Sequence, residues 1–279
     1  MQPFHPSSSY QYQQQTEQQP YSLLDEMLTE GCISFTFGLQ YAEHYLRYLL
    51  KTEPRSLTSY MVSPASGWAG SYSIRQAALP TFRPNAQSSE GHPLLLIDYK
   101  ADLRRGSIVP QSLWTPHSPT DQHQYVQSAS LSLPIFFVHE NGAVGLSVAD
   151  AAAGRCQSLR GAGLPADMRD KASTHIRINW PGCVEWKRQF QTKDETEQRN
   201  PITLERLVRH VGRSIDHFLQ QHEVDPKHPI PHWRIGHGGI ARDNITVLGV
   251  CHVTSGSWMP ILQVFPAVFD LQMPVPFET

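Results

Sequence analysis

The sequence has few cysteines, and none of them form the close pairs typical of disulfide-rich or zinc-binding proteins. The four are Cys32, Cys156, Cys183 and Cys251, and no C-x-x-C motif is present. Disulfide frameworks of small secreted domains and structural zinc sites both need characteristic thiol spacings. The sequence therefore predicts four reduced thiols, which is typical of a cytosolic or nuclear protein.

Long apolar runs are also missing. No stretch approaches the ~20 apolar residues that span a bilayer. The first 20 residues are rich in Gln, Ser and Tyr, and they lack the basic start and apolar core of a secretory signal. We expect an intracellular protein, nuclear or cytoplasmic, that neither enters a membrane nor is exported.

An excess of charge of either sign is missing too. The chain has 23 basic and 25 acidic residues, so its formal net charge is -2. Such a balance provides no broad field to attract a polyanion, so it predicts no nucleic-acid partner. Apolar residues are sparse at 39%, and the 22 prolines exceed the usual share, so part of the chain is not expected to pack.

Changes in composition divide the chain into five regions. A Gln-rich tract offers too little aliphatic surface to offset the entropy lost on ordering, and it is expected to be disordered. The expected regions are a disordered tail at 1–20, a helical segment at 21–54, a proline-rich linker with short islands at 55–130, an α+β domain at 131–268 and a C-terminal tail at 269–279.

The helical segment shows leucines at steps of three and four, which predicts two helices separated near Gly31 and Gly38 and closed by Pro54. A leucine stripe of this kind in the helical segment is more often ordinary core than a docking surface. In the linker, only the apolar run 93–97 is expected to form a buried strand.

The α+β domain is predicted to begin with a strand at 133–138 and a tight turn at Asn141–Gly142. Ser147 is the expected N-cap of a helix that runs to about Leu159. Alternating residues then predict a hairpin of strands at 174–180 and 186–190, with the second strand at a sheet edge.

Thr203 is the expected N-cap of the best-supported helix, whose apolar residues continue to Leu219. Two closing strands are predicted at 245–253 and 258–265. The fold class is therefore α+β, with a mixed or antiparallel sheet of four strands, packed helices and a disordered N-terminal arm.

Candidate catalytic and metal-binding motifs are weak. His228, His232 and His237 lie in one proline-rich loop, but their spacing fits no known ligand pattern. The sequence has no P-loop, no dinucleotide-binding fingerprint and no G-x-S-x-G nucleophile motif. Cys251 and His252 are neighbours on a strand and point to opposite faces, so they do not form a dyad. No catalytic residue, metal ligand or cofactor is predicted.

One region favours an interaction. Trp180, Trp186, Arg188 and Phe190 place aromatic and basic side chains on the predicted hairpin, and such residues often anchor partner proteins. The alternative is that the tryptophans are core residues of the hairpin. The Ser-Pro and Thr-Pro dipeptides at Ser63, Thr115 and Ser118 are candidate phosphorylation sites in the linker.

Three stretches carry a resemblance to a known family. They are residues 133–138, residues 176–182 with their continuation through 186–189 to Pro201-Ile202-Thr203, and residues 256–262. Together they resemble the fungal clampless-type developmental proteins and their uncharacterised relatives over roughly residues 131–265. The resemblance implies a role in basidiomycete sexual development, in clamp-cell formation and growth of the dikaryon, without enzymatic activity or cofactor.

The leading hypothesis is a non-enzymatic regulator of fungal sexual development that acts through contacts with a protein partner. The rival is a small hydrolase-like enzyme whose site is assembled only in three dimensions, with His232, His237 or His252. The rival requires a deep pocket with convergent polar groups, and the regulator requires an exposed aromatic or basic patch. A continuous Arg/Lys stripe beside the hairpin would instead indicate nucleic-acid binding.

Overall fold

The computed structural model describes residues 20–54, 60–63, 70–75, 94–169, 171–223 and 229–265. The predicted tails at 1–20, apart from Pro20, and 269–279 lie outside the described residues. None of the helices in these ranges is long and apolar enough to cross a bilayer.

The N-terminal segment forms three helices where the sequence predicted two. They are α1 (Pro20–Glu30), α2 (Cys32–Phe37) and α3 (Leu39–Leu50). Both predicted glycines interrupt the helix: Gly31 has extended backbone, and Gly38 has a φ of 80°, which favours glycine. The last helix ends at Lys51 in the left-handed conformation, before Pro54.

The main sheet is mixed, one of the two predicted alternatives, but it has seven strands where the sequence predicted four. Its order is β5-β9-β10-β7-β8, with β4 paired to β10 and β6 paired to β9. The strands are β4 (Ser107–Ile108), β5 (Ile135–Phe136), β6 (Leu146–Ser147), β7 (Ser173–Ile178), β8 (Trp186–Gln191), β9 (Ile245–Thr254) and β10 (Ser257–Val264). The β10–β7 pair is parallel and the other pairs are antiparallel.

The predicted hairpins of β7–β8 and of β9–β10 are confirmed. The β7–β8 pair runs in register from Ser173–Gln191 to Ile178–Trp186, and β8 ends the strand order as the expected edge. The turn before Gly142 also forms, with the Gly142 N–H donating to the His139 carbonyl. The flanking strands are shorter than predicted because both pair with β9 rather than mainly with each other.

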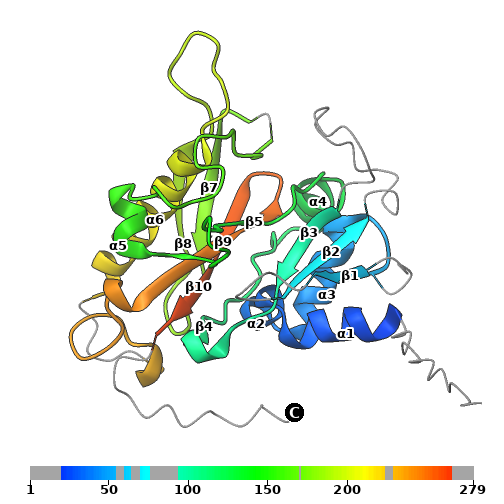
Figure 1. The fold of residues 1–279 in the computed structure, drawn as a ribbon, viewed down its shortest axis with the longest axis horizontal. Helices are drawn as coiled ribbons and strands as arrows, with labels where there is room; N and C mark the ends of the chain where they lie inside the picture. The colour runs from blue at the N-terminus through cyan, green and yellow to red at the C-terminus, as the bar shows by residue number, and fades with distance from the viewer. Residues whose placement is uncertain are drawn as a thin grey trace, which may run out of the picture.

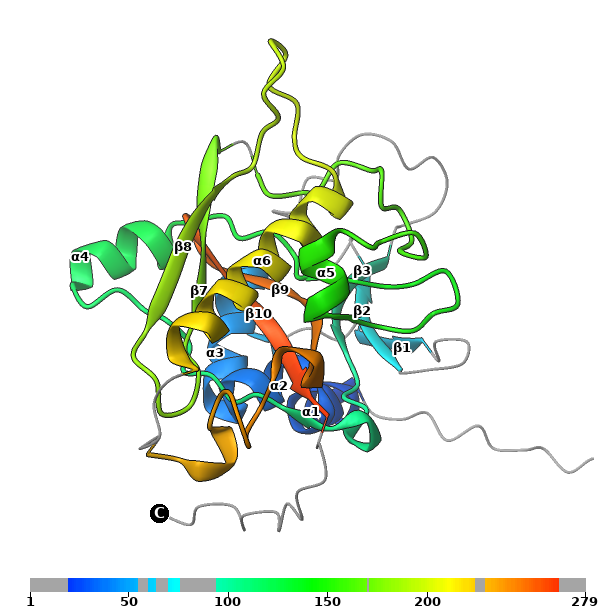
Figure 2. The same cartoon turned by 90° about the vertical axis from the view of Figure 1, so that its left-hand side faces the viewer.

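Two helices cover one face of this sheet. The first, α5 (Val148–Ala153), has Ser147 as its N-cap and ends at Gly154 in the left-handed conformation, so the prediction that it continues to Leu159 is wrong. The second, α6 (Leu204–His222), is confirmed with Thr203 as N-cap. Figure 2 shows both helices in front of β9 and β10, with α2 and α3 behind.

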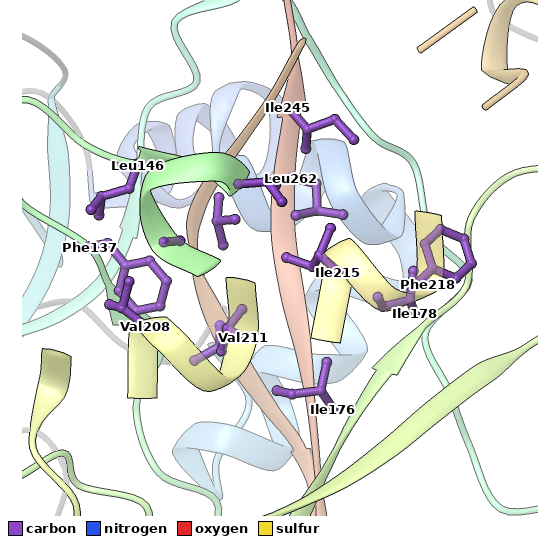
Figure 3. Packing of buried hydrophobic residues seen from close by; sticks show 14 of the residues in the cluster. Phe137, Leu146, Ile176, Ile178, Val208, Val211, Ile215, Phe218, Ile245 and Leu262 are labelled. Carbon is purple, nitrogen blue, oxygen red and sulfur yellow. The ribbon is translucent and has the colours of Figure 1, made fainter. Parts of the chain in front are cut away.

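A first core cluster fills the space between α5, α6 and the sheet. Figure 3 shows its apolar side chains converging from the helices and the strands. Its central members, all fully buried, are Phe137, Ile176, Ile178, Val208, Val211, Ile215, Phe218, Ile245 and Leu262. Burial of this area is the main favourable term that holds α6 against β7 and β10.

A second core cluster covers the opposite face of the same sheet. Apolar residues of α1–α3 pack in one cluster with Cys251, Met259 and Ile261 of the central strands. This cluster also includes a small antiparallel sheet of β1 (Tyr60–Ser63), β2 (Ser71–Arg75) and β3 (Leu94–Tyr99), visible beside the helices in Figure 1.

The second cluster changes the predicted domain organisation. The expected linker at 55–130 contains three paired strands and β4 in its described part, and only the strand at 94–99 was predicted. The helical segment and the α+β domain share this cluster, because the N-terminal helices, together with the small sheet, cover the second apolar face of the central sheet. The boundary at residue 131 therefore does not separate two cores.

Short elements complete the described chain. They are the 3-10 turns η3 (Leu103–Arg105), η5 (Pro231–Trp233) and η6 (Arg242–Asn244), the short helix α4 (Pro119–Gln122) and the π-helical turn η4 (His123–Gln127). A buried carboxylate joins the small sheet to α2, since Asp98 accepts hydrogen bonds from the Ile33 and Tyr99 N–H groups. Burial raises the pKa of Asp98 well above its usual range, although these bonds oppose the shift.

Candidate functional site: a groove beside the β7–β8 turn

An open groove of about 520 Å³ lies where three distant parts of the chain meet. One wall is the α2–α3 junction at residues 36–41, the second is the segment 110–112, and the third is the end of β7 with its turn, at residues 179–185. The second cavity found in the described chain measures about 20 Å³ and holds little more than a single water. The groove is therefore the better candidate for a binding site.

The first wall depends on the break at Gly38. The Gly38 N–H donates to the Ser34 carbonyl at the end of α2, and the Ala42 N–H donates to the Gly38 carbonyl at the start of α3. Both backbone groups of Gly38 are therefore hydrogen-bonded where the two helices meet. The change of direction leaves Leu39 and Tyr41 on the surface, 56% and 52% exposed. Tyr41 lines the groove, and Leu39 follows the lining residue Gly38 in the chain.

The second wall is fixed by Gln111, whose side chain is 3% exposed. Its backbone N–H donates to the Thr36 carbonyl at 2.6 Å, and its Nε2 donates to the Pro260 carbonyl at 2.7 Å. Its Oε1 accepts from the Asn179 N–H at 3.1 Å. One glutamine therefore connects α2, β10 and the end of β7, which fixes the width of the groove.

The floor of the groove is a rigid aromatic cluster. Trp180 is 1% exposed, and its Nε1 donates to the Trp233 carbonyl at 2.8 Å. Its ring lies edge-on to Trp233 at 5.8 Å and tilted against Phe218 at 6.0 Å. Beyond it the turn leaves Val184 77% exposed. Because its contacts fix the indole, the floor is already formed before any ligand binds.

The charges beside the groove are internally paired. Glu185 forms an ion pair with Arg177, a residue only 9% exposed. The Arg177 guanidinium also donates from Nε to Ser257 Oγ at 2.9 Å and lies 3.6 Å above the Trp114 ring. Burial lowers the pKa of Arg177, and Glu185 opposes that shift. The groove is consequently aromatic and amide-rich without a free catalytic charge.

The predicted interaction residues are divided between the core and the surface. Trp180 and Phe190 are 1% and 7% exposed, so their assignment to an exposed face is wrong and the core alternative holds for both. Trp186 is half-buried, with its Nε1 donating to Gln221 Oε1 at 2.5 Å. Arg188 is exposed on β8. Trp186, Arg188 and Phe190 share one face of β8 by alternation. Residues of α6 pack on Phe190 and Trp186, whereas Arg188 stays exposed.

The predicted phosphorylation sites also differ in their surroundings. Thr115 is half-buried. Ser118 is the N-cap of α4 and accepts from the Asp121 N–H at 3.4 Å. The side chain of Ser63 lies outside the described residues. Among the two sites that the structure describes, phosphorylation of Ser118 would add charge at a helix N-terminus, where negative charge is favourable.

The histidines of the rival enzyme hypothesis do not line the groove. His232 and His237 are exposed, and His228 lies outside the described residues. His252 is buried, stacks on Trp258 at 4.4 Å and accepts at Nδ1 from the Ser132 N–H. Burial lowers its pKa to about 3, with Arg169 adding to the shift. No group of three or more metal-ligating side chains occurs within the ranges that the structure describes.

Sequence reasoning missed most of the groove. Leu39 was assigned to an apolar helical stripe, Tyr41 was not singled out, and nothing in the local pattern around Gln111 indicates its three partners. The glycine at position 38 was the one available signal, since a break between two apolar helices exposes the residues that follow it. The chain matches no protein-family model, no curated protein sequence and no solved structure.

Proposed function

We propose that this protein is a non-enzymatic interaction protein that binds an extended, proline-containing segment of a partner protein in the groove. The observation that carries the proposal is a groove lined by the exposed Tyr41 and the buried Trp180. The exposed Leu39 and Val184 are next in the chain to residues of its walls. Large apolar side chains exposed together beside a concave surface are typical of a protein interface.

The chemistry of the walls favours an extended, uncharged ligand. Aromatic and proline side chains, among them Tyr41, Pro110 and Pro181, form surfaces on which polyproline-type segments pack. The buried Asn179 Oδ1 has no hydrogen-bond partner in the described part of the chain, and it offers an acceptor to an N–H of a bound segment. The Arg177–Glu185 pair leaves no net charge to attract a charged ligand.

The biological setting is proposed from the resemblance alone. The likeness to the clampless-type developmental proteins supports a regulator of fungal sexual development that takes part in clamp formation and dikaryon growth. The proposed nuclear or cytoplasmic location rests instead on the spacing of the four cysteines, which contains no C-x-x-C pair. The rival hydrolase has less support, because the only carboxylate on the groove wall, Glu185, is held in an ion pair and no histidine lines this groove.

Peptide selection with matched variants tests the groove. A displayed library of proline-containing peptides is selected on the full chain, and the selected peptides are measured by fluorescence anisotropy on the parent, Tyr41→Ala and Tyr125→Ala. Tyr125 is a suitable control because it is 41% exposed on η4 and does not line the groove. We expect Tyr41→Ala to weaken binding by about tenfold or more, as hot-spot aromatics do, and Tyr125→Ala to leave it unchanged.

Thermal unfolding of the three proteins distinguishes a binding defect from a folding defect. Both tyrosines are surface residues, so both variants are expected to unfold at the parent temperature. The proposal fails if no peptide is selected, or if both substitutions lower the affinity for the selected peptides equally. It also fails if the purified chain hydrolyses ester or amide substrates and a histidine substitution abolishes that activity.

A further inference from the structure

A cluster of arginines lies on the outer face of α6, next to β8. Its members are Arg188, Arg206, Arg209 and Arg213, with His210 between them, and we refer to these five residues as the arginine cluster. Figure 2 shows α6 and β8 side by side on this face. The groove, by contrast, is built from α2, α3, the segment 110–112 and the β7–β8 turn.

The spacing on α6 explains why these side chains gather. Positions 206, 209, 210 and 213 occupy one face over two helical turns, a length of roughly 10 Å. Arg188 joins them from β8, where its Nη1 donates to the Arg213 carbonyl at 3.4 Å. The His210 ring stacks on Phe190 at 5.1 Å, which holds the imidazole against the sheet.

The positive charges of the cluster are uncompensated. No carboxylate in the described ranges lies within ion-pair distance of Arg188, Arg209 or Arg213, and Arg206 has only Glu195 at 3.9 Å, a side chain 95% exposed. Elsewhere on the described surface, arginines commonly have a close carboxylate: Arg104 with Asp102 at 2.8 Å and Arg155 with Asp150 at 2.7 Å are examples. Unpaired like charges at this spacing repel one another.

The pKa of His210 reflects the positive charges around it. Burial, followed by the charges of the four arginines, lowers its pKa to about 4, so the imidazole is neutral near pH 7. Its Nε2 is buried without a hydrogen-bond partner among the described residues. The surface thus has several charged donors without a close carboxylate, and a buried imidazole nitrogen without a partner lies among them.

We propose that the arginine cluster binds a phosphorylated serine or threonine in a segment of a partner protein. Guanidinium groups donate paired hydrogen bonds to phosphate oxygens, and arginine clusters are the common means of recognising phosphorylated segments. The patch is compact and bounded, with Glu195 near Arg206 and Asp216 paired with Arg242 further along α6. Its length suits one phosphate group.

A nucleic-acid partner fits this surface less well. Single-stranded nucleic acids need a long basic track with exposed aromatic rings on which bases stack. Here Phe190 is buried under His210, and Trp186 is half-buried with its Nε1 bonded to Gln221. The net charge of -2 adds no general attraction for a polyanion.

Fluorescence anisotropy tests this proposal with the full chain. The probes are a labelled synthetic peptide pool with a fixed phosphoserine or phosphothreonine and degenerate flanks, the same pool unphosphorylated, the same pool with glutamate at that position, and a labelled oligonucleotide in single-stranded and duplex form. We expect binding of the phosphorylated pools alone, weakening as salt is added and competed by inorganic phosphate at high concentration.

Variants assign the binding to the cluster. Arg213→Ala and Arg188→Ala are each expected to lower the affinity for the phosphorylated pool by about tenfold, the usual effect of losing a charged hydrogen bond. Arg155→Ala is the matched control, since Arg155 is an exposed arginine outside the cluster, and it is expected to bind as the parent does. The Tyr41→Ala groove variant is expected to bind the phosphorylated pool normally, so the two proposals fail separately.

Three outcomes would overturn the inference. They are equal binding of phosphorylated and unphosphorylated pools, tighter binding of the oligonucleotide than of any peptide, and an Arg155→Ala effect as large as that of Arg213→Ala. Unchanged thermal unfolding of each variant excludes loss of structure as the cause, because all three arginines are surface residues.

Discussion

Replacing Gly212 with alanine is expected to destabilise the protein, although alanine is the better helix former. Gly212 lies inside α6, where it faces α5. A Cβ at this position would lie 2.4 Å from the Ala152 nitrogen, 2.6 Å from the Ala151 carbonyl carbon and 2.7 Å from the Ala151 Cβ. These atoms belong to backbone or to a side chain with no freedom to rotate away, so the two helices must separate.

Two opposing terms set the magnitude. Alanine gains about 1 kcal/mol over glycine in a helix interior. Forcing extra volume into a packed contact costs typically 1–3 kcal/mol and sometimes more, and a contact this short with backbone belongs at the upper end of that range. We therefore expect a net loss of about 2 kcal/mol, which corresponds to a Tm lower by roughly 4–8 °C for a domain of this size.

Urea denaturation followed by circular dichroism measures the effect. Gly163→Ala is the matched control, because a Cβ there meets no atom within 4 Å and Gly163 does not have positive φ. The control is expected to change the free energy of unfolding by less than about 0.5 kcal/mol. A Gly212→Ala protein as stable as the parent, or more stable, would show that helix propensity outweighs the α5–α6 contact and would refute the reasoning.

Three further predictions concern buried polar groups. Gln111→Ala is expected to lower the free energy of unfolding by about 1–3 kcal/mol in urea titrations and to weaken groove ligands, because it leaves buried partners unpaired. The depressed pKa of His252 means that the unfolded chain binds a proton between about pH 6.5 and 3 that the folded chain does not, so stability is complete above that window and falls as the pH drops. Within this window, His252 makes the free energy of unfolding change by up to about 1.4 kcal/mol per pH unit. In denaturant titrations over the same pH range, His252→Gln should show a smaller change per pH unit. Arg177→Lys is expected to cost about 1–2 kcal/mol in thermal or urea unfolding, because lysine keeps the charge but loses the planar contact with Trp114; equal stability would contradict the role assigned to that contact.

The elements predicted well were those with long, regular patterns. The apolar positions of α6 repeat over about four turns, and β9 and β10 are long runs of apolar residues joined by a short turn, so local sequence was sufficient for each. The end of α5 was placed too late because its alanines favour helix. Gly154 in the left-handed conformation ends it first.

The missed features depend on contacts between distant residues. The strands of the small sheet are four to six residues long, and β1 and β2 gain their stability from partners that local pattern does not reveal. The groove has the same difficulty, since Gln111 meets Pro260 across 149 residues of sequence. Trp180 and Phe190 were correctly placed on a hairpin, but the hairpin pattern alone does not show that α6 covers that face.

The position of β9 and β10 in the sheet has a consequence for biosynthesis. These strands lie near the C-terminal end of the described chain, yet they occupy the middle of the sheet and contribute residues to both core clusters. On the ribosome, the α1–α3 helices and the β7–β8 hairpin emerge first and must wait, with their apolar faces unburied, until the last strands leave the exit tunnel. Nascent chains that stop before β9 should therefore bind chaperones and be degraded, while emergence of β9 and β10 lets both clusters form.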